Sequence, residues 1–140
     1  MDTTNLLALD FGEARIGVAI ASQEARLPSP LQTLKNDGQI WQNLLAVIAE
    51  NRIGTVVVGL PRGLDGQETA QTAKARNFMN ELRERIDLPV IAQDEAATSV
   101  KATEELESRG KPYDKGAIDA LAATYILEDY LHDTPAMEDR

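Results

Sequence analysis

An α/β fold, with a mixed sheet and helices on both of its faces, is predicted by three features of this sequence. Two apolar segments near the N-terminus, residues 6–9 and 15–22, have the composition of strands and are separated by a short turn. Two further apolar runs, 55–58 and 89–92, are too short for helices and alternate with amphipathic helical patterns. Because the chain has 140 residues and 43% of them are hydrophobic, we expect one core and a single domain over residues 1–140.

The N-terminal segments predict a hairpin followed by an edge strand. The first run ends at Asp10, and residues 11–14 form the turn. In the second strand, large side chains alternate with the small residues Gly17, Ala19 and Ala21, and this small face would let a helix pack closely. A third strand is expected around residues 26–34, where Pro28 and Pro30 favour a position at the sheet edge.

The middle of the chain predicts a helix, a buried strand and a second helix. Asp37 is a suitable N-cap for a helix that runs to about Asn51. Residues 55–58 are apolar on both faces, which is typical of a central strand. After the Asp65-Gly66 turn, helical spacing defines a long helix with the apolar stripe Ala75, Phe78, Met79, Leu82 and Ile86.

The C-terminal part predicts one more strand and two more helices. The strand at 89–92 stops at residues 93–95, and Thr98 or Ser99 would cap a helix that closes near Gly110. A final helix is expected from about Asp114, with apolar positions at Ile118, Leu121, Ala122 and Tyr125. We expect residues 133–140 to be a frayed tail.

Composition excludes several classes of site. Cysteine is absent, which removes disulfides, thiolate zinc sites and cysteine nucleophiles, and suits a reducing cytoplasm. No run approaches the roughly 18 apolar residues of a membrane span, so we expect no membrane partner. The start of the chain lacks the basic residues of a signal peptide. His132 is the sole histidine and is expected to be solvated, so catalysis through a histidine base is not expected.

Acidic residues at the ends of predicted strands are the most informative feature. Asp10 and the pair Asp94-Glu95 each stand where an apolar strand emerges, which would bring carboxylates to one rim of the sheet. Asp119 lies on the final helix, where Ala122 and Ala123 leave its face small enough to approach the sheet. Clustered carboxylates repel unless they are protonated or bridged by cations, and hard oxygen ligands suit Mg²⁺ or Mn²⁺.

Each acid alone has an ordinary interpretation. Asp10 could be a turn former, Asp94 or Glu95 a solvated surface acid, and Asp119 a helix residue paired with Lys115. Their joint placement favours a metal site. Two ions in such a site can activate a water molecule and stabilise the leaving oxygen of a phosphodiester.

The same residues resemble the YqgF family, which is described both as pre-16S ribosomal RNA nuclease and as Holliday junction resolvase, with a ribonuclease H-like fold. The resemblance covers nearly the whole chain, in order, on four separate elements. The segments that carry it are residues 9–19, residues 57–61 with Asp65-Gly66, Asp94-Glu95 with Thr98-Ser99, and residues 119–123 through Ile126-Leu127.

The resemblance implies a five-stranded mixed sheet, dependence on Mg²⁺ or Mn²⁺, and phosphodiester hydrolysis. It implies that Asp10, Glu95 and Asp119 are the catalytic metal ligands. Arg15 and Arg76 match basic positions of the family that would contact phosphates. The chain departs from the family at Ala96-Ala97, where an arginine and a leucine are usual, and this departure bears on how substrate is bound more than on the metal site.

Nucleic acid is the expected partner, although the net charge of −9 argues against tight non-specific binding. Arg62 and Lys74 are further residues that could line a nucleic-acid path. A structural ion pair is an equally good interpretation of Arg15 and Arg76. Trp41 lies on a helical apolar stripe, so core packing is favoured over base stacking.

The function that these expectations favour is a metal-dependent nuclease of structured nucleic acid that processes the 5′ end of pre-16S rRNA. A Holliday junction resolvase is the alternative, and a symmetric junction would call for a homodimer. A non-catalytic module that binds RNA or protein is a third possibility. A nucleotide-binding half-domain of the actin and sugar kinase type is a fourth, but that architecture needs two related halves, and no Walker loop is present.

Overall fold

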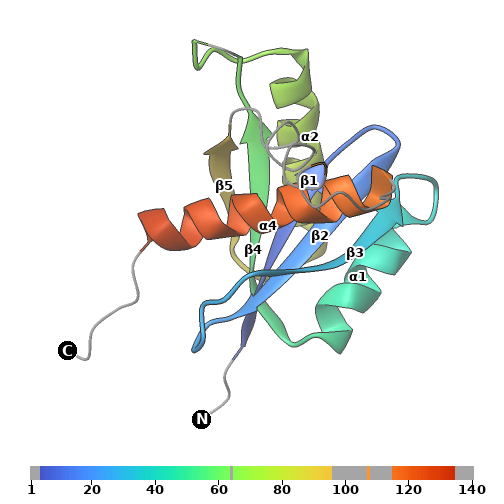
Figure 1. The fold of residues 1–140 in the computed structure, drawn as a ribbon. Coiled ribbons are helices and arrows are strands. Elements are labelled where there is room, and N and C mark those ends of the chain that lie inside the picture. The colour runs from blue at the N-terminus through green and yellow to red at the C-terminus, as the bar shows by residue number, and fades with distance from the viewer. Residues whose placement is uncertain (1–3, 64, 96–106, 108–114, 135–140) are drawn as a thin grey trace.

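A five-stranded sheet with helices on both faces forms the body of the protein (Figure 1). The structure, a computed structural model, describes residues 4–63, 65–95, 107 and 115–134. The strands are β1 (Asn5–Phe11), β2 (Arg15–Ser22), β3 (Ser29–Lys35), β4 (Ile53–Pro61) and β5 (Val90–Glu95). The helices are α1 (Ile40–Glu50), α2 (Ala70–Arg85) and α4 (Lys115–Asp133).

The strand order is β3-β2-β1-β4-β5, and the sheet is mixed. β2 pairs antiparallel with both β1 and β3, whereas β4 pairs parallel with both β1 and β5. The carboxyl ends of β1, β4 and β5 therefore meet at one edge. The predicted mixed five-stranded sheet is confirmed. β3 spans 29–35 instead of the predicted 26–34 and occupies an edge of the sheet, as Pro28 and Pro30 predicted.

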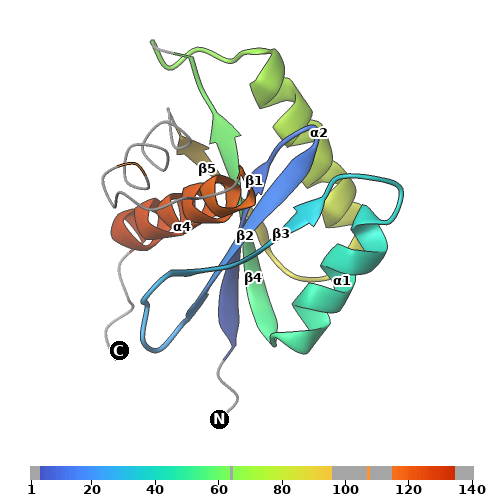
Figure 2. The same cartoon turned by 45° about the vertical axis from the view of Figure 1, so that its right-hand side comes forward.

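The two faces of the sheet carry different side chains because successive residues of a strand point in opposite directions. Helices α1 and α2 cover one face and α4 crosses the other, as the turned view in Figure 2 shows. The first face is packed with large aliphatic side chains, including Leu7, Leu9, Ile16, Val18, Val56 and Val58. The second face is lined mostly by small ones, and α4 lies against Ala8, Ala19, Ala21 and Val57 through Ala123, Ile126 and Leu127.

Several predicted boundaries need correction. β4 and β5 extend past the predicted 55–58 and 89–92, because their backbone pairing continues to Pro61 on β4 and through the polar residues 93–95 on β5. Asp37 is not the N-cap of α1. That position belongs to Gln39, and the Asp37 side chain accepts a hydrogen bond from the Gln39 backbone at 2.9 Å. Ile86 lies just beyond α2, at its C-cap.

Other predictions fall on parts of the chain that lie outside the described residues. They are the helix from Thr98 or Ser99 to Gly110, of which only Glu107 is described and is helical, the start of the final helix at Asp114, and the tail from residue 135. Asp133 is still part of α4. None of the helices in the described ranges combines the length and the apolar character needed to cross a membrane.

Candidate active site

Close packing between β2 and α4 positions the first part of the site. A Cβ atom added at Gly17 would lie 1.9 Å from the carbonyl oxygen of Asp119, so only glycine allows the α4 backbone to approach at this point. Gly17 is also the partner of Asp10 across the β1–β2 pair. The small face predicted for this strand is therefore confirmed, and its consequence is that Asp119 lies over the end of β1.

Asp10 and Asp119 interact electrostatically. Asp10 shares a face of β1 with Leu6 and Ala8, the face that α4 covers. Burial, together with a smaller contribution from the charge of Asp119, raises the pKa of the Asp10 carboxyl from 3.8 to about 7. Neighbouring carboxylates that resist ionisation together are stabilised by a bound cation, which is the chemical property of a hard-metal site.

Arg15 completes this part of the site. Its Nε donates a hydrogen bond to Oδ2 of Asp119 at 2.6 Å, and the two side chains are 37% and 19% exposed. The guanidinium therefore holds one oxygen of Asp119 from the first residue of β2. The alternative pairing of Asp119 with Lys115 rests on a side chain that lies outside the described set.

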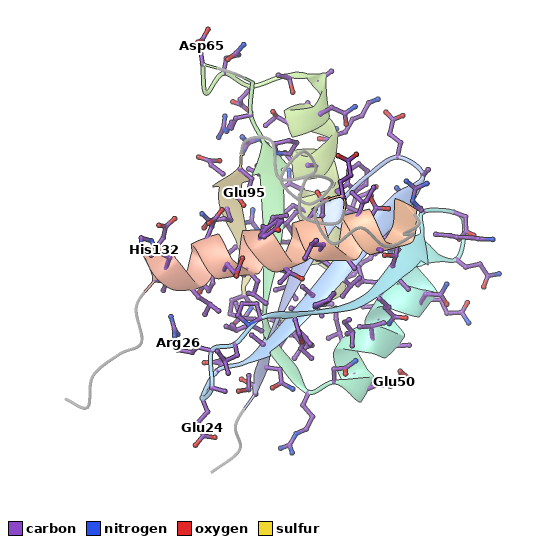
Figure 3. All side chains as sticks on the ribbon, in the orientation of Figure 1. Glu24, Arg26, Glu50, Asp65, Glu95 and His132 are labelled. Carbon is purple, nitrogen blue, oxygen red and sulfur yellow. The ribbon has the colours of Figure 1, made fainter. Side chains whose placement is uncertain are left out.

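Glu95 lies on the same face of the sheet, at the carboxyl end of β5 (Figure 3). It is 8% exposed. Two positions earlier on the same face, Gln93 donates a hydrogen bond to Asp133 of α4 at 2.9 Å. The neighbouring Asp94 points to the other face, where it meets Arg62. The Asp94-Glu95 pair is thus divided between two surfaces, and Glu95 is the acid that faces the α4 side.

The structure brings Asp10 and Asp119 together. Glu95 reaches the same edge of the sheet from β5, which is separated from β1 by β4. Within the described ranges, no three acidic or histidine side chains are grouped closely enough to hold a metal ion. Asp10 and Asp119 fit a divalent cation by their oxygen chemistry and their mutual repulsion.

All four predicted nucleic-acid-binding residues are engaged with carboxylates. Besides the Arg15 pair, Arg62 binds Asp94 at 2.9 Å, Arg76 binds Glu68 at 2.7 Å, and Lys74 pairs with Glu13. Arg62 also lies 3.8 Å from Glu68, so it shares that acid with Arg76. These pairs are partly exposed, and solvent-exposed pairs exchange partners at little cost.

Two further expectations can be compared with the structure. Trp41 is half-buried and stacks on Phe78, with ring centroids 5.1 Å apart, as expected for a residue that packs against the core. His132 is exposed near the C-terminal end of α4 (Figure 3). Asp119 lies near the other end of the same helix. The Ala96-Ala97 departure lies outside the described residues.

The sheet order and the acidic edge define the class as a ribonuclease H-like fold, and solved structures agree. Thermus thermophilus RuvC, in the structure described as "T. thermophilus RuvC in complex with Holliday junction substrate", matches with a TM-score of 0.58 at 20% identity, covering 95% of this chain and 98% of that chain. Fowlpox virus resolvase in complex with Holliday junction DNA matches with a TM-score of 0.53 at 14% identity, covering 93% of this chain and 98% of that chain.

Sequence comparisons give the family. The family model RuvX, described as Holliday junction resolvase, matches residues 4–133. A protein of Haemophilus ducreyi named "Putative pre-16S rRNA nuclease" is 38% identical over 136 residues, 94% of this chain and 99% of the relative. A Pectobacterium carotovorum protein of the same name is 39% identical over 134 residues, 93% of this chain and 96% of the relative. The chain belongs to this family of nucleases, and the resemblance inferred from its motifs is confirmed, as is its assignment to the phosphodiester hydrolases.

Proposed function

We propose that this protein hydrolyses phosphodiester bonds at the 5′ end of pre-16S rRNA, in the cytoplasm, with Mg²⁺ or Mn²⁺ as cofactor. The name shared by its relatives supports this substrate. The observation that carries the proposal is the pair of carboxylates, Asp10 and Asp119, brought together where β1 reaches the carboxyl edge of the sheet. An acid whose pKa is raised by burial and by a second acid is poised to exchange its proton for a metal ion.

Asp10, Glu95 and Asp119 are the proposed metal ligands and catalytic residues. Glu95 is included because it is the buried acid on the same face and at the same edge as the other two. A bound divalent ion would supply Lewis-acid activation of water and neutralise charge on the phosphate. Arg15 orients the Asp119 carboxylate through its 2.6 Å hydrogen bond.

The proposed nucleic-acid path uses Arg15, Arg62, Lys74 and Arg76. Each is paired with a carboxylate in the protein alone, so phosphates would replace these acids as partners when substrate binds. This exchange explains how an acidic protein can bind RNA without holding it tightly. Affinity should therefore be modest and should fall with added salt.

The test is cleavage of a pre-16S rRNA fragment by the purified protein with Mn²⁺, compared with the Asp10→Asn variant. We expect cleavage by the wild type and a loss of about two orders of magnitude or more in the variant, since one ligand of the reacting metal is gone. Far-ultraviolet circular dichroism checks that the variant is folded. Absence of cleavage by the wild type would favour a non-catalytic binding module instead.

Holliday junction resolution is the second candidate, favoured by the description of the matching family model. Symmetric cutting of a four-way junction needs two active sites, so this activity would require a homodimer. A four-way DNA junction belongs in the same assay, with sedimentation analysis of the protein alone and with junction. Paired, symmetric nicks by a dimer would favour a DNA junction over RNA as the substrate.

A further inference from the structure

A cavity of about 290 Å³ opens on the face of the sheet opposite the acidic site. It lies between the end of β1 and the helices α1 and α2, which Figure 2 shows on that side of the sheet. Three aromatic side chains line it, one from each element: Phe11, Trp41 and Phe78. Phe11 directly follows Asp10, so the cavity and the acidic site lie on the two faces of one strand end.

The aromatic residues form a continuous wall. The Phe78 ring lies 4.9 Å from that of Phe11 and 5.1 Å from that of Trp41, centroid to centroid. Phe78 is buried, whereas Phe11 and Trp41 are half-buried and keep part of their surface at the cavity. The Arg85 guanidinium lies 4.3 Å from the centre of the Trp41 ring and fixes its orientation. The wall is therefore preformed, which lowers the entropic cost of binding a flat ligand.

Polar side chains of α2 border the aromatic wall. Asn77 and Glu81 lie one turn apart, line the cavity and are exposed. In the described part of the chain, neither side chain makes a hydrogen bond or an ion pair, so their amide and carboxylate groups are available to a ligand. Lys74, one turn earlier, is paired with Glu13.

The charges select a nucleobase over a phosphate. Glu81 offsets Lys74, so the lining carries no net positive charge that would attract an anion. A carboxylate accepts hydrogen bonds from the exocyclic amino groups of adenine, cytosine and guanine, whereas uracil and thymine have none to donate. An asparagine amide can both donate to and accept from a base edge. Aromatic rings beside such groups are the usual means of holding an unpaired base.

We propose that this cavity binds one unpaired, amino-bearing nucleobase of the nucleic-acid substrate, held against Phe11 and Trp41 and read by Glu81 and Asn77. The inference rests on the proposed function, because the base would belong to a nucleotide flanking the cleaved bond. A nucleic-acid strand that crosses the carboxyl edge of the sheet at Asp10 would reach the cavity on the opposite face of β1.

Trp41 is the only tryptophan and reports on the cavity directly. Short homopolymeric oligoribonucleotides of adenosine, cytidine and uridine are titrated into the full-length protein in EDTA, which prevents cleavage, and Trp41 fluorescence is recorded. We expect saturable quenching by the adenosine and cytidine oligomers, and at least fivefold weaker binding of the uridine oligomer.

Two pairs of exposed residues on α2 supply matched variants. Glu81→Gln should weaken binding of the adenosine and cytidine oligomers about tenfold, so that the protein no longer prefers them to the uridine oligomer. Glu84→Gln, outside the cavity, should leave all three affinities unchanged. Asn77→Ala should likewise weaken binding, with Asn80→Ala as its control. Phe11→Leu, which keeps an apolar side chain against the core, should weaken binding of all three oligomers, since it removes a stacking surface.

The outcomes separate this proposal from the nuclease itself. Asp10→Asn should abolish cleavage and leave Trp41 quenching intact. Quenching without cleavage by the wild type would keep the base site and reject the proposed function. Cleavage without quenching would keep the proposed function and reject the base site. Equal affinity for the three oligomers, or equal effects of Glu81→Gln and Glu84→Gln, would overturn the base site.

Discussion

Gly17 and Asp119 are in backbone contact: a Cβ on the glycine would stand 1.9 Å from the Asp119 carbonyl oxygen and 2.2 Å from its carbonyl carbon. These atoms belong to the helix backbone, which cannot move aside as a flexible side chain can. The contact fixes the depth at which α4 lies on β2. Because Asp10 is the partner of Gly17 on β1, the same contact sets the distance between the two carboxylates.

Gly17→Ala should therefore displace α4 and separate Asp119 from Asp10. We expect a loss of unfolding free energy of about 1 to 3 kcal/mol from overpacking, with a larger proportional loss of metal binding and cleavage. Urea denaturation and calorimetric titration with Mg²⁺ measure the two effects. Gly38→Ala is the control, because an added Cβ there meets nothing within 4 Å and should leave metal binding unchanged.

Because the charge of Asp119 contributes to the raised pKa of Asp10, removal of that charge should change the pH at which Asp10 titrates. In metal-free protein, the Asp10 carboxyl should titrate near the value of about 7, and Asp119→Asn should lower that pKa toward its usual range by removing the neighbouring charge. Carbon-detected NMR of the carboxyl resonance gives both values. Burial contributes more than Asp119 does, so the pKa in the variant should remain above 3.8. An Asp10 pKa that does not respond to Asp119→Asn would show that the two groups are not coupled.

Stability should depend on pH through the same group. The Asp10 carboxyl binds its proton more tightly in the folded chain than in the unfolded chain, where its pKa is 3.8. Its contribution to stability is therefore complete below about pH 4 and is lost as the pH rises through about 7. Without metal, Asp10→Asn should be more stable than the wild type above that range, by on the order of a few kcal/mol, and equally stable near pH 4.

Added Mg²⁺ should reverse the order of stability of the wild type and Asp10→Asn. The ion offsets the repulsion that Asp10 experiences, so it should raise the melting temperature of the wild type at about pH 8 and leave Asp10→Asn nearly unchanged. Thermal unfolding with and without EDTA measures the difference. A wild-type protein that gains no stability from Mg²⁺ or Mn²⁺ would argue against a metal site at Asp10.

Strands and candidate acidic residues were easier to predict from the sequence than the contacts that bring the acidic residues to their partners. Alternation of Ile16, Val18 and Ile20 with small residues predicted both the strand and the helix that packs on it, because that pattern has a direct steric meaning. The ends of β4 and β5 were missed, since strand pairing continues through Gly59 and Pro61 on β4, which predict a turn, and through polar residues on β5 that carry no apolar signal.

The ion pair between Arg15 and Asp119 could not be derived from the sequence in the same way. The two residues are 104 positions apart, and their contact depends on how far α4 approaches the sheet. The only available signal was Gly17, two residues after Arg15, as a position where close approach is possible. The division of Asp94 and Glu95 between two faces follows from strand alternation, but only once β5 is known to include both.

Arg15→Met tests whether Arg15 orients Asp119 or mainly contacts phosphate. Removal of a cation beside Asp119 should strengthen Mg²⁺ binding several-fold while it weakens RNA binding, since the guanidinium competes with the metal for the carboxylate and attracts phosphate. Stability should change by less than about 1 kcal/mol because the pair is partly exposed. Calorimetry with Mg²⁺ and RNA anisotropy in EDTA separate the effects, and Arg83→Met, whose guanidinium donates a hydrogen bond to the Val90 carbonyl oxygen, is the control.

Asp94 and Glu95 provide the sharpest comparison because they are neighbours with opposite predicted effects. Glu95→Gln removes a buried acid from the α4 face and should reduce cleavage by about two orders of magnitude or more if Glu95 is a metal ligand. Asp94→Asn removes the exposed partner of Arg62, so it should leave cleavage by bound metal intact and tighten RNA binding by freeing that arginine for phosphate. Single-turnover cleavage and RNA anisotropy at two salt concentrations measure both. If Asp94→Asn abolishes cleavage and Glu95→Gln does not, the ligand assignment at the end of β5 is wrong, and the catalytic face would be the one that carries α2.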